Sequence, residues 1–579
     1  MGMYHIAEEA HFGNLAQLHG AETVIVTLKI IGEDEANPYQ SRPALMYLMQ
    51  GQDVFVLELS KIDVSKALSE LFTSPQVTKV FRRAKPAIKQ LLHHYQIRTQ
   101  NVFCCALASQ LLAMGNRREK AMLAERVAEI REGFRVVDQM SFDIRAPLNA
   151  ETFQMAQAEI GLTQKLHHQL AEDLVKAKLK RVSSLEFRTV LPVAAMELRG
   201  IYADRQRLNE ARQQIETDMD GIQSDLLREL RGPEALPGLE ILNLNSPEQV
   251  KFALHSRGIM VQDTAESRLR PYVAKFPFIG QLLEYRRLSR LLASVTSQLA
   301  NFIQPDTGRI HATYHQISSS SGRFACSNPN IQQIPREAFV RSCIRAEQGN
   351  CFIVADYSQV ELRVAAGLSK DALMLKAYSE NGDLHKLTAA ITMGKPADQV
   401  TKAERQAAKA INFGLIYAMG ARGLQQSAQS SYGVAMSLEE AQLFRQRYFE
   451  NYRGIQKWQK DTEHFGRKNG YVRTAAGRIR SYRDEALRVT ELLNTPVQGT
   501  AAEGLKSALC IFGDEVERLG LNAAIVAIIH DEIIVEVQAD QAEKTKGVLE
   551  KAMVDGIAWL VPNVPFSVDA AIADSWADK

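Results

Sequence analysis

The sequence predicts a multidomain protein of mixed α/β and α+β class, and three observations carry this prediction. The chain has 579 residues, too many for one hydrophobic core, so several domains of about 150 residues each are expected. Its first part alternates short apolar runs with helical stretches, which is an α/β pattern. Beyond Gln304 the pattern changes to loops, a strand, helices and a hairpin, which indicates a second architecture.

Composition limits the classes of protein to consider. With 46% hydrophobic and 23% charged residues the chain is typical of folded soluble proteins. The net charge is only +2, so a polyanionic partner must bind a local basic patch. Six cysteines without CxxC pairs argue for a reducing compartment and against structural zinc. Because no signal peptide or membrane-spanning run is found, we expect a cytoplasmic protein with no membrane partner.

The first part of the chain predicts short strands over Thr23–Ile31, Ala44–Met49 and Asp53–Leu59, and a helix over Val64–Leu71. From Glu151 to Leu230 the chain reads as mostly helical and carries no strand signal.

A second helical stretch, Pro277 to Phe302, contains "LLEYRRLSRLLASV". Its basic face either is solvated or follows a phosphate backbone.

The segment "CFIVADYSQVELR", Cys351 to Arg363, places a carboxylate at the end of an apolar strand. Asp356 ends the strand, and Glu361 follows where a helix begins. A strand end fixes a metal ligand while the adjoining loop keeps the ion accessible. The alternative is that Asp356 only caps the helix.

The segment "ERQAAKAINFGLIYAMG", Glu404 to Gly420, repeats functional side chains every four residues. On a helix they form one stripe in which two cations suit phosphates and two rings suit a base or sugar. An ordinary amphipathic helix with the rings in a core is the alternative. The four residues are Arg405, Lys409, Phe413 and Tyr417.

The segment "AIIHDEIIVE", Ala527 to Glu536, sets three polar residues between two β-branched runs. The pattern predicts a tight hairpin turn. Its charged side chains are either exposed to solvent or have a functional role. The polar residues are His530, Asp531 and Glu532.

Together these segments resemble motifs A, B and C of DNA polymerase family A, the bacterial DNA polymerase I-like enzymes. The resemblance extends over roughly Leu191 to the C-terminus. Flanking matches are "YRRLSRLLAS", "SGRFACSNPNIQQIP", "GDLHKLTA", "GYVRTAAGRIR" and "NTPVQGTAAEGLK".

This resemblance implies a right-hand polymerase over residues 181–579, with a thumb at about 205–300, fingers at about 386–485, and a palm at about 305–385 and 486–579. The implied activity is template-directed addition of deoxynucleotides to a primer 3′-hydroxyl. The implied partners are primer-template DNA and deoxynucleoside triphosphates, bound by a monomer.

The resemblance also implies two Mg²⁺ ions, replaceable by Mn²⁺, held by Asp356 and Asp531 with Tyr357 as a further ligand. One ion activates the primer hydroxyl, and the other neutralises the triphosphate. Glu532 would support this site, and Lys409 is the candidate proton donor to pyrophosphate.

Further site residues follow from the same family motifs. Glu361 would exclude a ribose 2′-hydroxyl, Phe413 would pack on the sugar and Tyr417 would abut the templating base. Contacts to the minor groove would test pair shape and not sequence. The nucleotide-binding set is Gln359, Glu361, His385, Arg405, Lys409, Phe413 and Tyr417, and the DNA-binding set is Arg323, Asn330, Gln333, Arg286, Arg290, Asn494, Gln498 and His530.

Three positions depart from the family pattern. Ala418 stands where the family usually has glycine, which suggests a stiffer hinge beside Tyr417. Thr490 stands where many relatives have arginine, which removes one possible DNA contact. Arg290 replaces the usual lysine of the thumb and keeps the charge.

Residues 1–180 resemble the family's 3′-5′ exonuclease domain, an RNase-H-like fold, through "VTKVFRRAKPAIKQLL" and "NVFCCALASQLL". Its metal-binding acids are missing, so we expect no proofreading. The alternative is a displaced metal site built from Glu33, Asp34, Asp138 or Asp143. We also expect no 5′-nuclease domain. The residues at the expected acid positions are Thr27, Lys29, Ala87, Cys104 and Gln157.

Three other classes of function compete with this interpretation. A nuclease needs the missing acids, and a non-catalytic DNA-binding remnant would not need both Asp356 and Asp531. A single-subunit RNA polymerase shares much of the framework, but Glu361 in "DYSQVELR" favours deoxynucleotides.

Overall fold

A computed structural model describes residues 2–139, 148–231 and 242–578 of the chain. Asp143, one candidate for a displaced metal site, lies outside the described residues. The chain forms two compact units, which we describe separately. The first comprises residues 1–199, 314–325 and 355–570, and the second comprises residues 200–313, 326–354 and 571–579.

The N-terminal domain of the first unit is built on a six-stranded mixed sheet in the order β1-β4-β3-β2-β5-β6. β3 runs antiparallel to β2 and β4, whereas β5 runs parallel to β2 and β6. The predicted strands and the α/β pattern are therefore confirmed. The strands are β1 (Met3–Ile6), β2 (Thr23–Gly32), β3 (Ser41–Gln50), β4 (Asp53–Glu58), β5 (Thr78–Phe81) and β6 (Val102–Cys104).

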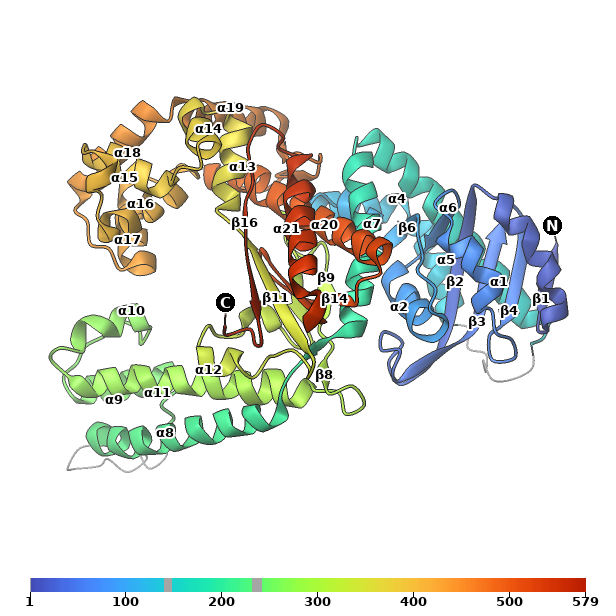
Figure 1. Cartoon of the computed structure of the whole chain (residues 1–579), viewed down its shortest axis with the longest axis horizontal. Helices are drawn as coiled ribbons and strands as arrows, with labels where there is room; N and C mark the ends of the chain where they lie inside the picture. Colours follow the sequence, from blue (N-terminus) through green and yellow to red (C-terminus); the bar gives the residue numbers. More distant parts are fainter. Residues whose placement is uncertain (1, 140–147, 232–241, 579) are drawn as a thin grey trace. The chain divides into compact units, whose positions relative to one another are not determined.

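Helices cover this sheet and lead out of the domain (Figure 1). The predicted helix near Val64 is present as α1, which buries Leu68, Leu71 and Phe72. An Asn149–Thr152 capping box begins α6 by satisfying the first free N–H groups of that helix. The helices are η1 (Glu9–Gly20), α1 (Ser65–Thr73), α2 (Ala84–Tyr95), α3 (Cys105–Leu112), α4 (Arg117–Arg126), α5 (Ala128–Gln139), α6 (Ala150–Lys176) and α7 (Lys180–Arg199).

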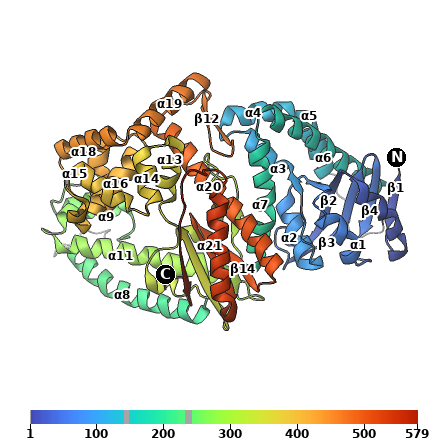
Figure 2. The ribbon, with the colours of Figure 1, turned by 45° about the horizontal axis from the view of Figure 1, so that its top comes forward.

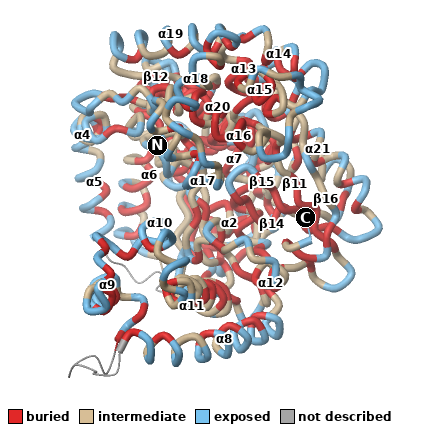
Figure 3. Tube along the Cα trace, turned by 90° about the vertical axis from the view of Figure 1, so that its left-hand side faces the viewer, coloured by how far each residue is buried: buried red, intermediate tan, exposed pale blue. Residues whose placement is uncertain are grey.

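A second, four-stranded sheet has the order β14-β15-β11-β16. Its inner strands are apolar and buried on both faces, as the β-branched runs predicted (Figure 3). The long helix α20 packs against α21 and α7 beside this sheet. The elements are β11 (Asn350–Tyr357), β14 (Ala523–Ile529), β15 (Glu532–Gln538), β16 (Val568–Ala573), α20 (Val489–Leu519), η7 (Ala539–Gln541) and α21 (Ala542–Ala558).

A helical group follows β11 in the first unit and carries the predicted nucleotide-binding stripe (Figure 2). Its helices begin at polar caps: Asp383 accepts from the first turn of α15, and Thr401 forms a capping box with Glu404 in α16. The elements are α13 (Val360–Ser369), α14 (Ala372–Ser379), α15 (Leu384–Met393), η6 (Ala397–Gln399), α16 (Lys402–Leu415), α17 (Ala421–Tyr432), α18 (Leu438–Asn451), α19 (Arg453–Asn469), β12 (Tyr471–Arg473) and β13 (Ile479–Ser481).

The second unit is mainly helical. The predicted helix from Pro277 continues beyond α11 through a π turn to Phe302. The region before Leu230 was expected to lack strands, but β7 pairs with β8 after Gly200, because a positive φ of 62° there lets the chain turn out of α7. The elements are β7 (Ile201–Tyr202), α8 (Arg205–Arg231), α9 (Pro247–Ser256), α10 (Glu266–Leu269), η2 (Arg270–Tyr272), α11 (Pro277–Ala293), η3 (Ser294–Leu299), η4 (Ala300–Phe302), β8 (Arg309–Ile310), η5 (Ile331–Gln333) and α12 (Ala338–Arg341).

Two short strands, β9 (Thr313–His315) and β10 (Ala325–Ser327), pair with each other, and each contains one of the points at which the chain passes between the units. Among the described helices, none is both long and apolar enough to cross a bilayer.

The N-terminal domain and the segment after β13 share hydrogen bonds within the first unit. Ser481 N donates to Met114 O at 3.0 Å. The side chain of Asn116 caps α4 through its oxygen, while its Nδ2 donates to Arg483 O at 3.1 Å and to Glu485 Oε1 at 2.9 Å. One buried side chain thus joins the two parts of the unit.

The end of α16 explains the departure at position 418. Met419 N donates to Gly414 O at 3.1 Å and Ala418 N to Leu415 O at 3.0 Å, which is a Schellman motif. Ala418 occupies the left-handed position of this motif with φ of 58°, where glycine has no steric cost.

We therefore expect Ala418→Gly to raise the free energy of unfolding by up to about 1 kcal/mol, because relief of the left-handed strain exceeds the entropy that glycine adds to the unfolded chain. Chemical denaturation followed by circular dichroism measures the change. Ala158→Gly, at an exposed position within α6, is the control and should lose about 1 kcal/mol. A loss of stability in Ala418→Gly as large as that in the control would contradict this account.

Candidate active site

Two carboxylates lie at a strand end and at a turn of the four-stranded sheet. Asp356 lies near the end of β11, and Asp531 lies in the turn between β14 and β15. Since Ile529 pairs with Glu532, the turn contains only His530 and Asp531. His530 adopts a left-handed φ of 60°, which tight hairpin turns require and which histidine tolerates better than most residues. The predicted hairpin is confirmed.

β15, which begins directly after this turn, is the direct neighbour of β11 in the sheet. Burial raises the pKa of Tyr357, and the charge of Asp531 raises it further, which places Asp531 near Tyr357. Asp356 does not cap the following helix: Gln359 is the N-cap of α13, and its φ is 55°. The capping interpretation of Asp356 is therefore wrong.

The environment of Asp531 suits a cation. Desolvation by the surrounding protein raises its pKa, and Glu361 and Glu532 raise it further, although the side chain itself stays accessible at the turn. A divalent cation would reverse this shift by stabilising the ionised carboxylate. The hydroxyl of Tyr357 donates to Met553 O at 2.7 Å, so only the backbone carbonyl of Tyr357 could serve as a ligand.

Across the described residues, no group of three or more His, Cys, Asp and Glu side chains is close enough together to hold a metal ion. Two carboxylates nevertheless fit Mg²⁺, which usually retains waters and is held by one or two carboxylates together with substrate phosphates. The donor set at Asp356 and Asp531 is of this kind.

Glu361 at the start of α13 is held from two sides. One carboxylate oxygen forms an ion pair with Arg323, and the other accepts from the hydroxyl of Tyr417. Burial raises the pKa of Tyr417, and the charge of Glu361 raises it further, so the phenol remains a donor. The carboxylate of Glu361 is therefore fixed in position.

Three of the four residues predicted to form one stripe lie on α16. Arg405, Lys409 and Phe413 lie on the helix, but α16 ends at Leu415. Tyr417 lies in the turn that follows, so the expected four-residue stripe on one helix is wrong at its last position. The Schellman motif is the physical reason, because the chain leaves the helix through the turn that ends at the left-handed Ala418, and Tyr417 lies in that turn.

Arg405 is oriented by an acid that the sequence analysis missed. Its Nε donates to Asp383 Oδ2 at 2.6 Å, while Asp383 Oδ1 accepts from His385 N at 3.0 Å. Burial raises the pKa of Asp383, but the hydrogen bonds from Arg405 and from Lys386 N, together with the charge of Arg405, outweigh burial and lower the pKa overall. The N-cap position of Asp383 before α15 is the sequence signal that could have revealed it.

His385 is buried and neutral. Burial lowers its pKa to about 4, so the imidazole carries no charge at physiological pH. Asn412 Oδ1 accepts from Thr388 Oγ1 at 3.0 Å, which turns the amide nitrogen toward Nδ1 of His385, also at 3.0 Å. Nδ1 therefore accepts, and the proton resides on Nε2 as a donor. Asn412, which the sequence analysis missed, selects this tautomer.

The remaining predicted DNA-binding residues fall in both units. On α20, Asn494 and Gln498 lie one turn apart, and Gln498 Nε2 donates to Asn494 Oδ1 at 3.5 Å. In the second unit Asn330 caps η5, and Gln333 is exposed. On α11, Arg290 is exposed, whereas Arg286 donates to Leu244 O and Thr264 O, both at 2.8 Å.

In the N-terminal domain, two cations bind acids, and one of them, Lys29, stands at an expected acid position. Lys29 Nζ on β2 lies 2.6 Å from Glu159 Oε2 on α6. Arg82 binds Asp138 through two hydrogen bonds of 3.1 and 3.0 Å and lowers the pKa of Asp138. The other expected acid positions hold uncharged residues: Thr27 on β2, Ala87 on α2, Cys104 at the end of β6 and Gln157 on α6.

Comparison with known proteins agrees with both parts of this structure. The profile of DNA polymerase family A matches residues 205–578, and a 3′-5′ exonuclease profile matches residues 34–175. The chain is 33% identical over 427 residues to DNA polymerase I of Aquifex aeolicus, covering 71% of each protein. It is 32% identical over 468 residues to DNA polymerase I of Pseudomonas aeruginosa, covering 76% of this chain and 48% of that protein.

A solved structure is also similar over its full length. It is described as the POL domain of Pol1 from M. smegmatis in complex with DNA primer-template and dNTP, and it has a TM-score of 0.83 at 25% identity, with 100% of both chains covered. The chain belongs to DNA polymerase family A and is a DNA-directed DNA polymerase preceded by a 3′-5′ exonuclease-like domain.

Proposed function

We propose that this polymerase extends a primer 3′-hydroxyl on a DNA template by metal-dependent nucleotidyl transfer, and that its N-terminal domain does not proofread. The observation that carries the first part is the neighbouring position of β11 and the β14–β15 turn, which supports convergence of Asp356 and Asp531 on one site.

Asp356, Asp531 and the carbonyl of Tyr357 are the ligands we assign to Mg²⁺, with Glu532 close by. When bound, Mg²⁺ would acidify the primer hydroxyl and neutralise phosphate charge. Mn²⁺ would serve in the same role, since it prefers the same oxygen ligands.

The residues of α15 and α16 would bind the incoming nucleotide. Arg405, already oriented by Asp383, and Lys409 supply positive charge for the triphosphate. His385 would add a neutral hydrogen bond from Nε2, so its contribution should not vary between about pH 5 and pH 9. Lys409 would protonate the departing pyrophosphate, and Phe413 would pack on the sugar.

Glu361 would sterically exclude a ribose 2′-hydroxyl, since Arg323 and Tyr417 hold both of its carboxylate oxygens in position. Gln359 lies at the N-cap of the same helix and would line the sugar site next to Glu361. Arg323, Asn494 and Gln498 would contact the minor-groove edge of the nascent pair, while Asn330, Gln333, Arg290 and His530 would contact the DNA backbone or primer end. Arg286 would support the thumb from within, given its two hydrogen bonds to carbonyl groups.

The first test replaces each carboxylate by its amide. Asp356→Asn or Asp531→Asn should slow primer extension by more than about 100-fold, because removal of a metal ligand raises the barrier by several kcal/mol. Binding of primer-template DNA should persist, since phosphate contacts elsewhere supply the affinity. Single-turnover extension and fluorescence anisotropy measure the two quantities.

Asp540→Asn, exposed in η7 directly after β15, is the matched control and should extend normally. Extension by either active-site variant at more than about a hundredth of the normal rate would remove that residue from the metal site.

The second test concerns sugar selection. Glu361→Ala should increase ribonucleotide insertion relative to deoxynucleotide insertion by about tenfold or more, because the side chain that excludes the 2′-hydroxyl is removed. Phe413→Tyr should ease acceptance of dideoxynucleotides, since the added phenol hydroxyl can make the hydrogen bond that the absent 3′-hydroxyl would otherwise make. Competitive single-nucleotide insertion measures both ratios.

Glu361→Gln keeps the volume of the side chain and serves as the control, with selection close to normal. Equal use of ribonucleotides and deoxynucleotides by the unaltered chain would favour an RNA polymerase and refute the role of Glu361.

The third test addresses proofreading. An end-labelled primer with a 3′ mismatch, incubated with Mg²⁺ and no nucleotides, should keep its full length. The proposal is supported by two ion pairs, Lys29 with Glu159 and Arg82 with Asp138. In each pair a cation neutralises a carboxylate that could otherwise bind a metal ion. Shortening that disappears in Glu159→Gln or Asp138→Asn, but survives in Asp356→Asn, would reveal a displaced exonuclease site.

A further inference from the structure

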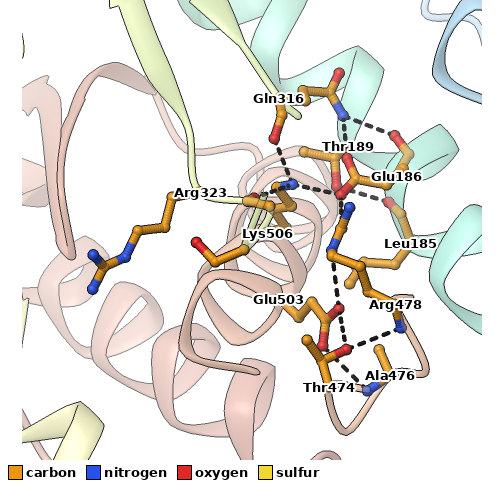
Figure 4. A network of polar contacts seen from close by, with 12 residues as sticks. Leu185, Glu186, Thr189, Gln316, Arg323, Thr474, Ala476, Arg478, Glu503 and Lys506 are labelled. Carbon is orange, nitrogen blue, oxygen red and sulfur yellow. Dashed lines mark hydrogen bonds and ion pairs between the residues drawn. The ribbon is translucent and has the colours of Figure 1, made fainter. Parts of the chain in front are cut away.

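Four charged side chains form a buried cluster close to the segment that carries Arg323 (Figure 4). Glu186 comes from α7, Arg478 from the turn before β13, and Glu503 and Lys506 from α20. Glu186, Glu503 and Lys506 have no exposed surface, and Arg478 is 4% exposed. Removing four such groups from water is costly, and buried ion pairs often add little net stability. A role beyond stability is therefore worth seeking.

The cluster is closed by mutual contacts. One oxygen of Glu186 accepts from both Lys506 and Arg478. Arg478 Nε lies 3.3 Å from Glu503 Oε1, and Glu503 also accepts from Thr474 Oγ1 at 2.7 Å. Glu186 thus fixes the position of the Lys506 ammonium.

Lys506 directs its remaining hydrogen bonds to one exposed loop. Its Nζ donates to Gln316 O at 2.7 Å and to Gly322 O at 2.9 Å, at the two ends of the serine-rich segment 317–321. The side chain of Gln316 also contacts the cluster, since its Nε2 donates to Glu186 O at 2.9 Å and to Glu186 Oε2 at 3.0 Å. The ammonium of Lys506 therefore holds both ends of the segment 317–321.

Gly322 shows how closely this loop rests on the cluster. Its φ is 82°, and a Cβ added there would lie 2.4 Å from Arg478 Nε. Only glycine fits, because any side chain would overlap the guanidinium. The backbone of the loop is therefore set by the buried charges.

Arg323 is the residue that this loop presents. Its backbone N donates to Ser319 Oγ at 2.9 Å, and the ring of its neighbour Phe324 lies 5.2 Å from Lys506 Nζ. The guanidinium of Arg323 points away from the cluster and pairs with Glu361 (Figure 4). Lys506 thus contacts the chain on both sides of Arg323 and leaves the Arg323 side chain facing the site.

We propose that Lys506, held by Glu186, is a positioning residue for Arg323: it fixes the loop from Gln316 to Gly322 so that Arg323 meets the minor-groove edge of the nascent base pair. This proposal rests on the polymerase function and on the role proposed above for Arg323. Burial lowers the pKa of Lys506 to about 8, so the ammonium is still protonated at neutral pH.

The test is a double-mutant cycle in the full chain. Lys506→Met keeps the aliphatic stem and removes the three donors. We expect it to lower kcat/KM for correct insertion about tenfold and to reduce discrimination against extending a mismatched primer terminus, as a misplaced minor-groove contact should. In an Arg323→Ala background the same change should have little further effect, because residues that act through one another are not additive.

Ser507→Ala, the neighbouring position on α20, is the control and should behave as the unaltered chain. Thermal unfolding by circular dichroism reports folding. If Lys506→Met does not fold, Gln316→Leu replaces it: this change removes the side-chain hydrogen bonds from Gln316 to Glu186 that help hold one end of the loop, and it leaves the ion pairs of Glu186 with Lys506 and Arg478 in place. The same non-additive pattern with Arg323→Ala is expected.

Additive losses in the Arg323→Ala background would overturn the proposal, because they would show that the cluster acts through general stability. Unchanged mismatch discrimination in the folded variants would overturn it as well. Absence of primer extension by the unaltered chain would instead refute the proposed polymerase function, so the two failures are distinguishable.

Discussion

The hydrogen bonds between β15 and β11 are the interaction on which the proposed chemistry depends. Neighbouring strands lie about 4.8 Å apart, so this pairing brings together a strand end and a turn that are far apart in the sequence. Both strands are buried on both faces, and a slip of one residue would exchange the side chains that pack on the two faces of the sheet. The packing on both faces therefore restrains the positions of Asp356 and Asp531.

Around this sheet, acids hold the cations of the proposed site and of the buried cluster. Asp383 orients Arg405, Glu361 pairs with Arg323, and Glu186 holds Lys506. Each pair restrains a long, flexible side chain before any ligand arrives, which lowers the entropic cost of binding. The neutral His385 follows the same principle, since Asn412 fixes its proton on one nitrogen. The site is organised by contacts among its own residues.

The sequence predicted the parts of the site that are encoded locally. The strand before Asp356 and the turn at Asp531 follow from β-branched runs interrupted by polar residues. Spacing also predicted Arg405, Lys409 and Phe413 on one helix, but it could not reveal that α16 ends before Tyr417, because the Schellman motif places alanine where glycine usually signals a helix end. The contacts of Arg286 and Lys506 escaped prediction for another reason: their partners are carbonyl groups distant in the sequence, which carry no residue-type signal.

The hydrogen bonds of Met114 and Asn116 bear on where the working polymerase begins. The family profile starts at residue 205, yet Ser481 and Arg483 find partners in the N-terminal domain, and Glu186 also precedes that start. Cutting the chain at the profile boundary would leave backbone groups without partners and Lys506 buried without its acid. The residues that precede the family profile thus supply hydrogen-bond partners and a counter-charge to the polymerase domain, and a fragment that keeps these contacts is longer than the region that defines the family.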